Sequence, residues 1–354
     1  MLNIDDFYFG VEVEFADAPL TEVVTMMRNA LAHTGIEVRQ EGWNHITRPY
    51  WKVTTDATVT RHRNYSRGEG FGGELVSPVL RGSEGFRHLK AVLDALNQHP
   101  QVNIDSRCGL HVHLSWDNMQ TVQIQNAVQR YARYESIIDS WMPPSRRAGV
   151  NSWCASINGN GYPLQRVASY NGSVDGLAGL AGRYYKVNLQ SLALNSHGTI
   201  EFRQHSGSTE FSKIEQWVKF LMNFVAASDT VPQDVTTYHR HKRSGNAFGE
   251  VRELFAARGW ELKYASRGTW KLSDENQMVI DEFTNDDLFG FYVDGVCDAN
   301  GHASRRAPQT LNQSFANYWS GKFGQITDDV FRGVGTDTQA YLESRIQHFA
   351  QQAA

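Results

Sequence analysis

Cysteine is scarce in this chain, which has three cysteines in 354 residues. Cys108, Cys154 and Cys297 are odd in number and lie far apart in the sequence. A disulfide framework needs paired cysteines and a structural zinc site needs closely spaced ligands, so this distribution argues against both. The low cysteine content favours a reducing compartment, and we therefore expect a cytoplasmic protein.

The chain also lacks long apolar segments and a strong charge of one sign. No run of 18 or more apolar residues occurs, so we expect no membrane-spanning helix and no membrane partner. Residues 1–6 contain neither a basic start nor an apolar run, and they are not expected to form a signal peptide. The formal net charge of -4 argues against a protein that binds nucleic acid through bulk positive charge.

What the chain does have is enough apolar sequence for a large core, with 41% hydrophobic and 12% aromatic residues. The length suits one large domain or two ordinary ones. The apolar periodicity stops at residues 231–246, which include the basic run YHRHKR at 238–243. This run can contact a polyanion, although a solvated linker explains it more simply. We therefore predict a catalytic domain at 1–230, a linker at 231–247 and a C-terminal extension of unknown role at 248–354.

Hydrophobic periodicity predicts a mixture of strands and helices. Alternating patterns predict strands at 7–15, within 36–80, and at 108–115, 184–194 and 198–204. Helical spacing predicts helices at 20–31, 86–96, 124–141 and 211–228, with a further helix around 248–255 and a hairpin of 260–264 with 269–272. The glycine-rich residues 158–182 predict a long loop, either a mobile lid or simply irregular structure. The irregular order and the polar strand faces favour an α+β fold with an antiparallel sheet.

One predicted strand carries a pair of histidines, in the sequence CGLHVHLS at 108–115. His111 and His113 are two residues apart, so both imidazoles project from the same face of that strand. A His-x-His pair also occurs on ordinary surface strands. It therefore indicates a site only in combination with other residues.

Acidic residues occur at the same two-residue spacing on other predicted strands. They are Glu12 and Glu14 on the first strand, Glu74 at a strand end, and Glu201 on one face with Arg203. Taken singly, each is equally explained by a solvated strand face, a charge before a turn or a cross-strand ion pair. The chemical interpretation depends on the convergence of these faces.

If the faces converge, the site holds four carboxylates. Unpaired carboxylates in a cleft repel one another and are costly to desolvate, whereas two divalent cations neutralise them. Oxygen-rich ligation with one imidazole suits Mg²⁺ or Mn²⁺ better than Zn²⁺. Arg203, two residues from Glu201, supplies the planar donors that a phosphate group accepts.

This ordered set of motifs resembles the amidoligase family, carboxylate–amine ligases with the glutamine synthetase and glutamate–cysteine ligase catalytic fold. The motifs are GVEVE at 10–14, ELVSP at 74–78, CGLHVH at 108–113 and TIEFR at 199–203. The resemblance covers residues 8–226, and SRR at 145–147 and YKVNL at 185–189 add to it. It implies an α+β fold: a glutamine synthetase-like curved antiparallel sheet with helices packed on one side, plus a small C-terminal α+β extension.

The resemblance also implies roles for the acidic residues and the first histidine. Glu14 and Glu74 would bind the metal ion nearest the carboxylate substrate. Glu12, His111 and Glu201 would bind the metal ion that holds the β- and γ-phosphates of ATP. The implied cofactors are thus ATP and Mg²⁺ or Mn²⁺, with two ions per site.

Further residues are implied as nucleotide or catalytic contacts. His113 would contact the nucleotide phosphates rather than a metal ion, and Arg146 and Arg147 are expected to bind the cofactor. Arg203 would bind the nucleotide and steady the γ-phosphate during its transfer. Asn188, on the strand before the Glu-Phe-Arg motif, is expected among the catalytic residues.

One segment departs from the family pattern, which often reads Trp-x-Val-x-x-Asp-Gly-Ser. Here residues 51–58 read WKVTTDAT, so Asp56 is retained but Ala57 and Thr58 replace the glycine and the serine. The resemblance implies that Asp56 binds or deprotonates the amine. A role as a turn residue explains Asp56 equally well.

Taken together, the resemblance implies an ATP-dependent carboxylate–amine ligase that forms an amide through an acyl phosphate. Its partners would be a small-molecule or peptide carboxylate and an amine, with a protein or nucleic-acid acceptor reached through the C-terminal part. Two alternatives stay open: a two-metal phosphoesterase or other metallohydrolase, and a non-catalytic binding or structural protein that retains the fold. The intact set of acidic and histidine residues speaks against the last.

Overall fold

A computed structural model of the chain describes residues 2–64, 66–147, 151–158, 161–193, 195–230, 252, 255–256, 259–266, 269–284 and 330–353. The predicted linker at 231–247 and its basic run lie outside the described residues, as does most of the helix expected around 248–255. None of the helices in the described part is long and apolar enough to cross a membrane.

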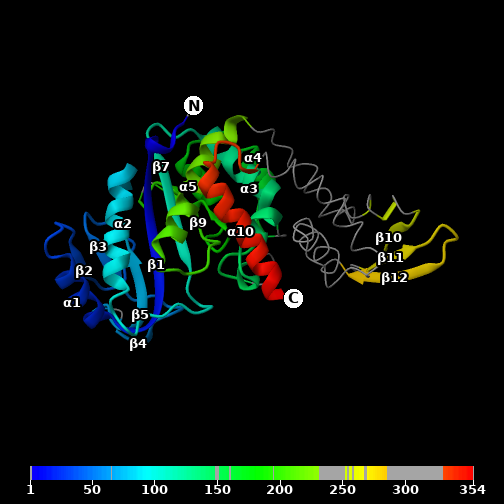
Figure 1. The fold of residues 1–354 in the computed structure, drawn as a ribbon. Helices are drawn as coiled ribbons and strands as arrows, with labels where there is room; N and C mark the ends of the chain where they lie inside the picture. Colours follow the sequence, from blue (N-terminus) through cyan, green and yellow to red (C-terminus); the bar gives the residue numbers. More distant parts are fainter. Residues whose placement is uncertain are drawn as a thin grey trace.

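A large sheet lies at the centre of the fold (Figure 1). Its strands are β1 (Phe7–Pro19), β2 (Val38–Gln40), β3 (Trp51–Thr54), β4 (Arg61–Asn64), β5 (Glu69–Val76), β6 (Leu80–Arg81), β7 (Leu110–Trp116), β8 (Val187–Asn188) and β9 (Ile200–Phe202). The strand order is β2-β3-β5-β1-β7-β9-β8, with β4 beside β5 and β6 beside β1. The pairings are antiparallel apart from the parallel pair of β2 and β3 at one edge.

Helices cover one face of this sheet. They are α1 (Leu20–Leu31), α2 (Gly82–Leu96), α3 (Thr121–Ser140), α5 (Phe211–Ala226) and α10 (Thr336–Ala353). The alternate residues Phe9, Val11 and Val13 of β1 are buried in the same core as these helices. Glu12 and Glu14 point to the other face because successive strand residues alternate. The predicted α+β fold, a mostly antiparallel sheet with helices packed on one side, is therefore confirmed.

The glycine-rich residues of the predicted lid are packed against α3. They form the short helix α4 (Leu164–Ala168) and a 3₁₀ segment at Asp175–Gly179. Gln125 of α3 donates hydrogen bonds to the backbone oxygens of Val167 and Tyr170, both at 2.7 Å. The apolar side chains between the glycines are buried in the main core. Residues 161–182 thus form irregular structure with short helical segments, and their mobility as a lid stays a prediction.

The C-terminal residues supply a small sheet and a helix. The predicted hairpin is present as β10 (Glu261–Ser266) and β11 (Thr269–Ser273), and an unpredicted strand, β12 (Val279–Thr284), pairs with β11. Helix α10 packs against α5 and α3. The ring of Phe331 stacks on Trp141 at 5.2 Å, so the last described segment joins the core of the first 230 residues. The domain boundaries themselves stay a prediction.

Candidate active site

Strand register brings the predicted site residues together on the face opposite the helices. Strand β1 lies between β5 and β7, with Glu14 opposite Glu74 and Glu12 opposite His111. On the next strand pair His113 is opposite Glu201. The four motifs, which are far apart in the sequence, therefore form one site.

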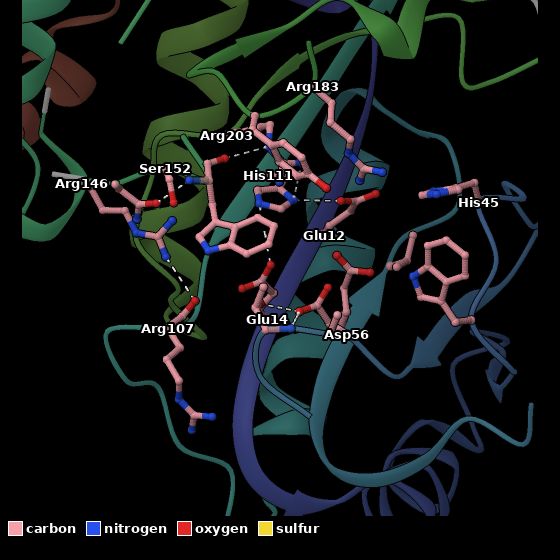
Figure 2. A pocket seen from close by; sticks show the side chains of 18 of the residues that line it. Glu12, Glu14, His45, Asp56, Arg107, His111, Arg146, Ser152, Arg183 and Arg203 are labelled. Atoms are coloured by element: carbon pink, nitrogen blue, oxygen red, sulfur yellow. Dashed lines mark hydrogen bonds and ion pairs between the residues drawn. The ribbon is translucent and has the colours of Figure 1, made fainter. Parts of the chain in front are cut away.

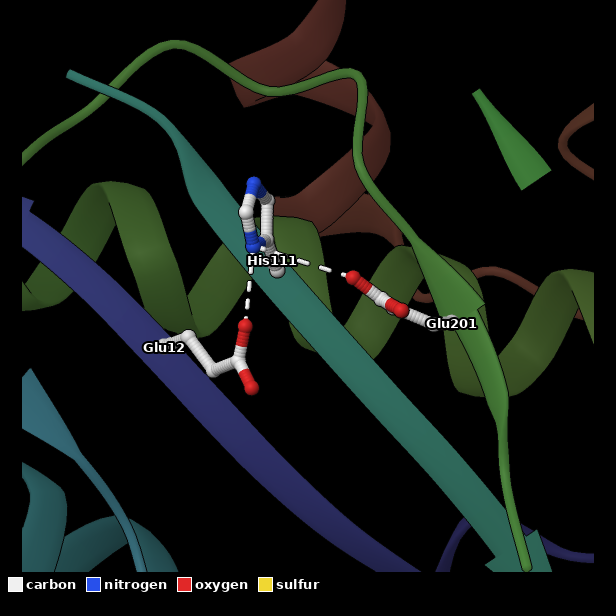
Figure 3. A group of neighbouring side chains, drawn as sticks. All are labelled: Glu12, His111 and Glu201. Atoms are coloured by element: carbon white, nitrogen blue, oxygen red, sulfur yellow. Dashed lines mark hydrogen bonds and ion pairs between the residues drawn. The ribbon is translucent and has the colours of Figure 1, made fainter. Parts of the chain in front are cut away.

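The first group of potential ligands consists of Glu12, His111 and Glu201, whose ligand atoms all lie within 4.8 Å of one another. Figure 3 shows the three side chains converging from β1, β7 and β9. Nδ1 of His111 lies 2.9 Å from Oε2 of Glu12 and 3.7 Å from Oε1 of Glu201. Two carboxylates and an imidazole at these distances fit a divalent cation.

A second group consists of Glu14, Glu74 and the same His111, again within 4.8 Å. Nε2 of His111 lies 3.8 Å from Oε1 of Glu14. The other oxygen of Glu14, Oε2, accepts a hydrogen bond of 2.7 Å from the backbone N–H of Gly109. His111 thus lies between the two groups, with one ring nitrogen facing each.

The electrostatics of the two groups differ. Burial, followed by the charges of Glu12, Asp56 and Glu14, raises the pKa of Glu74 well above its ordinary value. Burial also raises the pKa of Glu14, although the charge of His111 partly offsets it. In the second group burial and mutual repulsion therefore favour the protonated form of the carboxyls, and a bound cation would favour the ionised form.

The carboxylates of the first group are ionised. Burial opposes the ionisation of Glu12, but the charge of His113 and hydrogen bonds with His111 and His113 lower the pKa of Glu12 well below its ordinary value. Burial likewise opposes the ionisation of Glu201, yet the Arg203 guanidinium lowers its pKa to about 2. The two carboxylates of the first group therefore favour the charged form, which is the form that binds a cation.

This difference predicts proton release when a metal ion binds. Because Glu74 and Glu14 have raised pKa values and must be deprotonated to act as ligands, Mg²⁺ or Mn²⁺ binding should release protons and weaken as the pH falls. Calorimetry in buffers of different ionisation enthalpy measures the number of protons released. Glu74→Gln serves as the control and should release fewer protons. Release that is absent, or equal in both proteins, would contradict the assignment of Glu74.

Glu201 is positioned by residues behind the site. Asn188 Nδ2 and Ser191 Oγ donate to Oε2 of Glu201 at 2.5 and 2.9 Å, and Arg203 Nη1 donates to Oε1 at 2.5 Å. Asn188 is buried and does not line the cavity described below. Its contacts orient Glu201 rather than a substrate. Ser191, three residues after Asn188, shares this role and was missed by the sequence reasoning.

His113 lies outside both ligand groups. Its Nδ1 is 2.9 Å from the Thr199 hydroxyl, and its Nε2 is 3.3 Å from Oε1 of Glu12. It lines a cavity of about 70 Å³ together with His197, on the far side of Glu12 from Glu14. The two histidines of the 108–115 strand are therefore unequal in position.

A larger cavity of about 930 Å³ opens over the two ligand groups (Figure 2). Of the predicted residues outside those groups, Asp56, Arg146 and Arg203 line it. Oδ1 of Asp56 also accepts a hydrogen bond of 2.7 Å from the backbone N–H of Thr58. Asp56 therefore shapes a turn and also lines the cavity, and its role toward the amine stays a prediction.

The two arginines of the SRR motif point in different directions. Arg146 is buried at the Glu14 end of the cavity, where its guanidinium donates to the backbone oxygens of Cys108 and Arg107. Arg147 donates to the backbone oxygen of Met142 at 3.0 Å and is not among the residues that line the cavity. Nucleotide contacts by these arginines stay predictions, and the geometry favours Arg146 over Arg147 as a residue of the site.

Several cavity residues carried no signal in the sequence because they belong to loops. They are Trp43, His45, Trp153, Arg183, Tyr184 and His197. Trp43 and Trp153 are about half exposed, at 50% and 49%, which is unusual for tryptophan. The rings of Trp153 and Tyr184 meet edge to face at 5.0 Å. The walls of the cavity are thus aromatic and cationic, whereas its floor is acidic.

Comparisons with known proteins give one family. Residues 5–225, more than half of the chain, match the profile of a family described as "Putative amidoligase enzyme". One solved structure, the crystal structure of the complex between prokaryotic ubiquitin-like protein Pup and its ligase PafA, matches with 11% identity and a TM-score of 0.31. That match covers 99% of this chain and 69% of that chain, but a TM-score this low establishes no common fold. No curated protein matches the chain.

Proposed function

The chain belongs to the amidoligase family, and from this premise we propose that it is an ATP-dependent carboxylate–amine ligase. The observation that carries the proposal is the pair of ligand groups that share His111. Arg203 lies directly beside one of them, held by Glu201. Paired cation sites next to an arginine are the arrangement that phosphoryl transfer requires.

We assign one Mg²⁺ or Mn²⁺ ion to Glu12, His111 and Glu201, and a second ion to Glu14 and Glu74, because a neutral imidazole has one free lone pair and binds one cation. When bound, the ions would neutralise the carboxylates and polarise the phosphoryl and carboxylate oxygens of the substrates. Oxygen ligands dominate both groups, which favours these hard cations over zinc.

The reaction has to activate a carboxylate, which is a poor electrophile because oxide is a poor leaving group. Transfer of the γ-phosphoryl group of ATP to a carboxylate oxygen forms an acyl phosphate and releases ADP. An amine then attacks the carbonyl carbon, phosphate leaves, and an amide is formed. The protein contributes mainly positioning and charge neutralisation in such a transfer.

Two side chains have direct parts in this proposal. Nη1 of Arg203 donates to Glu201, and its Nε lies 3.4 Å from the backbone oxygen of Trp153. These two contacts hold the guanidinium at the cavity, where it would stabilise the transferring phosphoryl group. Asp56, which faces the cavity near Glu14 and Glu74, would bind the amine and accept its proton.

The test is an assay of the purified protein with ATP, Mg²⁺ and panels of carboxylates and amines. ADP release that depends on both an added carboxylate and an added amine, with an amide found by mass spectrometry, supports the ligase. Phosphate release without these substrates would indicate the two-metal hydrolase instead. Absence of metal binding in calorimetry would indicate a non-catalytic protein.

We propose that the carboxylate and the amine are small molecules or groups of a peptide. A macromolecular acceptor would use the C-terminal part, where Tyr264, Met278 and Val279 of the small sheet are exposed at 49%, 68% and 53%. Exposed apolar side chains on a short sheet are suited to a protein partner.

The two histidines provide a prediction that separates metal binding from nucleotide binding. Because His111 faces both ligand groups, His111→Ala should weaken Mg²⁺ or Mn²⁺ binding by about 10–100-fold. Because His113 lies outside both ligand groups and contacts Glu12, Thr199 and the ring of His197, His113→Ala should chiefly raise the KM for ATP. Calorimetry with the metal ion and initial rates against ATP concentration measure the two effects. An equal loss of metal affinity in both variants would show that the assignment is wrong.

A further inference from the structure

Arg183 lines the large cavity but belongs to neither ligand group and to none of the sequence motifs. Its position is defined by the backbone around it. The N–H of Ala155 donates to the backbone oxygen of Tyr184 at 2.8 Å, and the N–H of Lys186 donates to the backbone oxygen of Ala155 at 2.9 Å. The segment that follows Arg183 is therefore joined to the segment that carries Trp153, whose backbone oxygen contacts Arg203.

The other lysine and arginine side chains of this cavity have partners. Arg203 is paired with Glu201 at 2.5 Å, and Arg107 with Asp105 at 2.6 Å. Lys52 donates to the backbone oxygens of Asn44 and Ile46, and Arg146 donates to those of Cys108 and Arg107. In each case the cationic group donates hydrogen bonds to a carboxylate or to a backbone carbonyl.

Arg183 differs from them within the described part of the chain. Its Nε is buried and has no hydrogen-bond partner. No carboxylate of the described residues lies within 4.0 Å of its guanidinium nitrogens, the distance that defines an ion pair. Its described contact is with a ring, since its guanidinium carbon lies 5.5 Å from the centre of the Tyr184 ring. An anion that enters the cavity would supply the partner that the buried Nε lacks.

The direction of Arg183 indicates which anion this is. In Figure 2 its guanidinium points toward Glu12 and His45. Burial and then the charge of Arg183 lower the pKa of His45, which agrees with this proximity. Arg183 therefore faces the group of Glu12, His111 and Glu201, whereas Arg146 lies at the opposite, Glu14 end.

We propose that Arg183 binds a phosphate group of the nucleotide, from the loop wall of the cavity, while Arg203 acts from the sheet. The inference rests on the proposed function, because the nucleotide phosphates are assigned to the Glu12, His111 and Glu201 group. The planar fork of a guanidinium matches two phosphate oxygens, and the unpaired donors of Arg183 are free to make these bonds. Arg183 is thus a binding residue for ATP that the sequence motifs do not include.

The test compares the Kd of ATP with Mg²⁺, measured by calorimetry, for the full-length wild type, R183Q and R107Q. R183Q should raise the Kd by about tenfold or more, because it removes charged hydrogen bonds to phosphate. R107Q is the matched control: it removes an arginine of the same cavity that Asp105 already pairs, and should change the Kd within about twofold. R183M, which keeps an apolar stem, provides a second neutral variant if R183Q does not fold.

The outcomes are distinguishable. ATP binding by the wild type with an unchanged Kd in R183Q and R183M overturns the role of Arg183 and leaves the proposed ligase standing. An equal increase in R183Q and R107Q overturns it as well, because the effect would be one of general charge. A wild type that does not bind ATP at all removes both the inference and the proposed function.

Discussion

Replacing Glu201 with glutamine is expected to lower amine-dependent ATP turnover by at least about 10²–10³-fold while the protein stays folded. Glutamine keeps the size of the side chain but removes the charge. The oxygen that Asn188 and Ser191 contact can be retained, whereas the amide nitrogen would then face Arg203. The variant loses a ligand of the first group and the anchor of Arg203 at once.

ADP release, metal calorimetry and circular dichroism together test this prediction. Glu84→Gln, on the exposed side of α2 with 73% of its side chain accessible, is the matched control and should leave turnover unchanged. Arg203→Ala should also abolish turnover but retain metal binding, because the ligands of both groups remain. Wild-type rates in either site variant would refute the mechanism while leaving membership of the family untouched.

Replacing Lys186 with methionine is expected to lower the free energy of unfolding by about 3–5 kcal/mol. Its ammonium group is fully buried, 2.8 Å from Oε1 of Glu135, and also pairs with Asp139 of α3. Methionine fits the space but leaves these two buried carboxylates without that cation. The backbone oxygen of Lys186 accepts a hydrogen bond of 2.9 Å from the N–H of Arg203. A local change in the backbone at Lys186 would therefore also displace Arg203 in the site.

Urea denaturation measures the loss for Lys186→Met. Lys90→Met is the control, because Lys90 and its partner Asp94 are 56% and 57% exposed, and it should change stability by no more than about 1 kcal/mol. An equal decrease in the free energy of unfolding in both variants would show that the buried ion pairs of Lys186 contribute no more to stability than an exposed ion pair. A stable Lys186→Met protein would mean that the apolar side chain replaces the ion pairs without cost.

Much of the fold could be predicted from the sequence because its signals are local. The alternation of Val11 and Val13 with Glu12 and Glu14 determined which face of β1 meets the helices and which face carries the acids. The helical spacing of apolar residues located α3 and α5 for the same reason. Side-chain direction repeats every two residues in a strand and every 3.6 residues in a helix, independently of the elements that pack against them.

Other features depended on partners distant in the chain. The glycines of 158–182 predicted a long loop, but the contacts of this segment with α3 and the burial of its apolar side chains became visible only in the fold. Arg147 is not among the residues that line the cavity, and its Nε donates to the backbone oxygen of Met142, just before Pro143. Loop residues such as Arg183 and Trp153 reach the site only through the folded path of the chain.

The sequence by itself determined the class of fold, the acidic and histidine residues of the site and their order along the chain. Only the tertiary structure decided that His111 faces both ligand groups, that Asn188 lies behind Glu201 and that Arg183 faces Glu12. The physical reason is strand register: Glu12 pairs with His111 and Glu14 with Glu74 across strands separated by tens of residues. A shift of one residue would turn each of these side chains to the other face of the sheet.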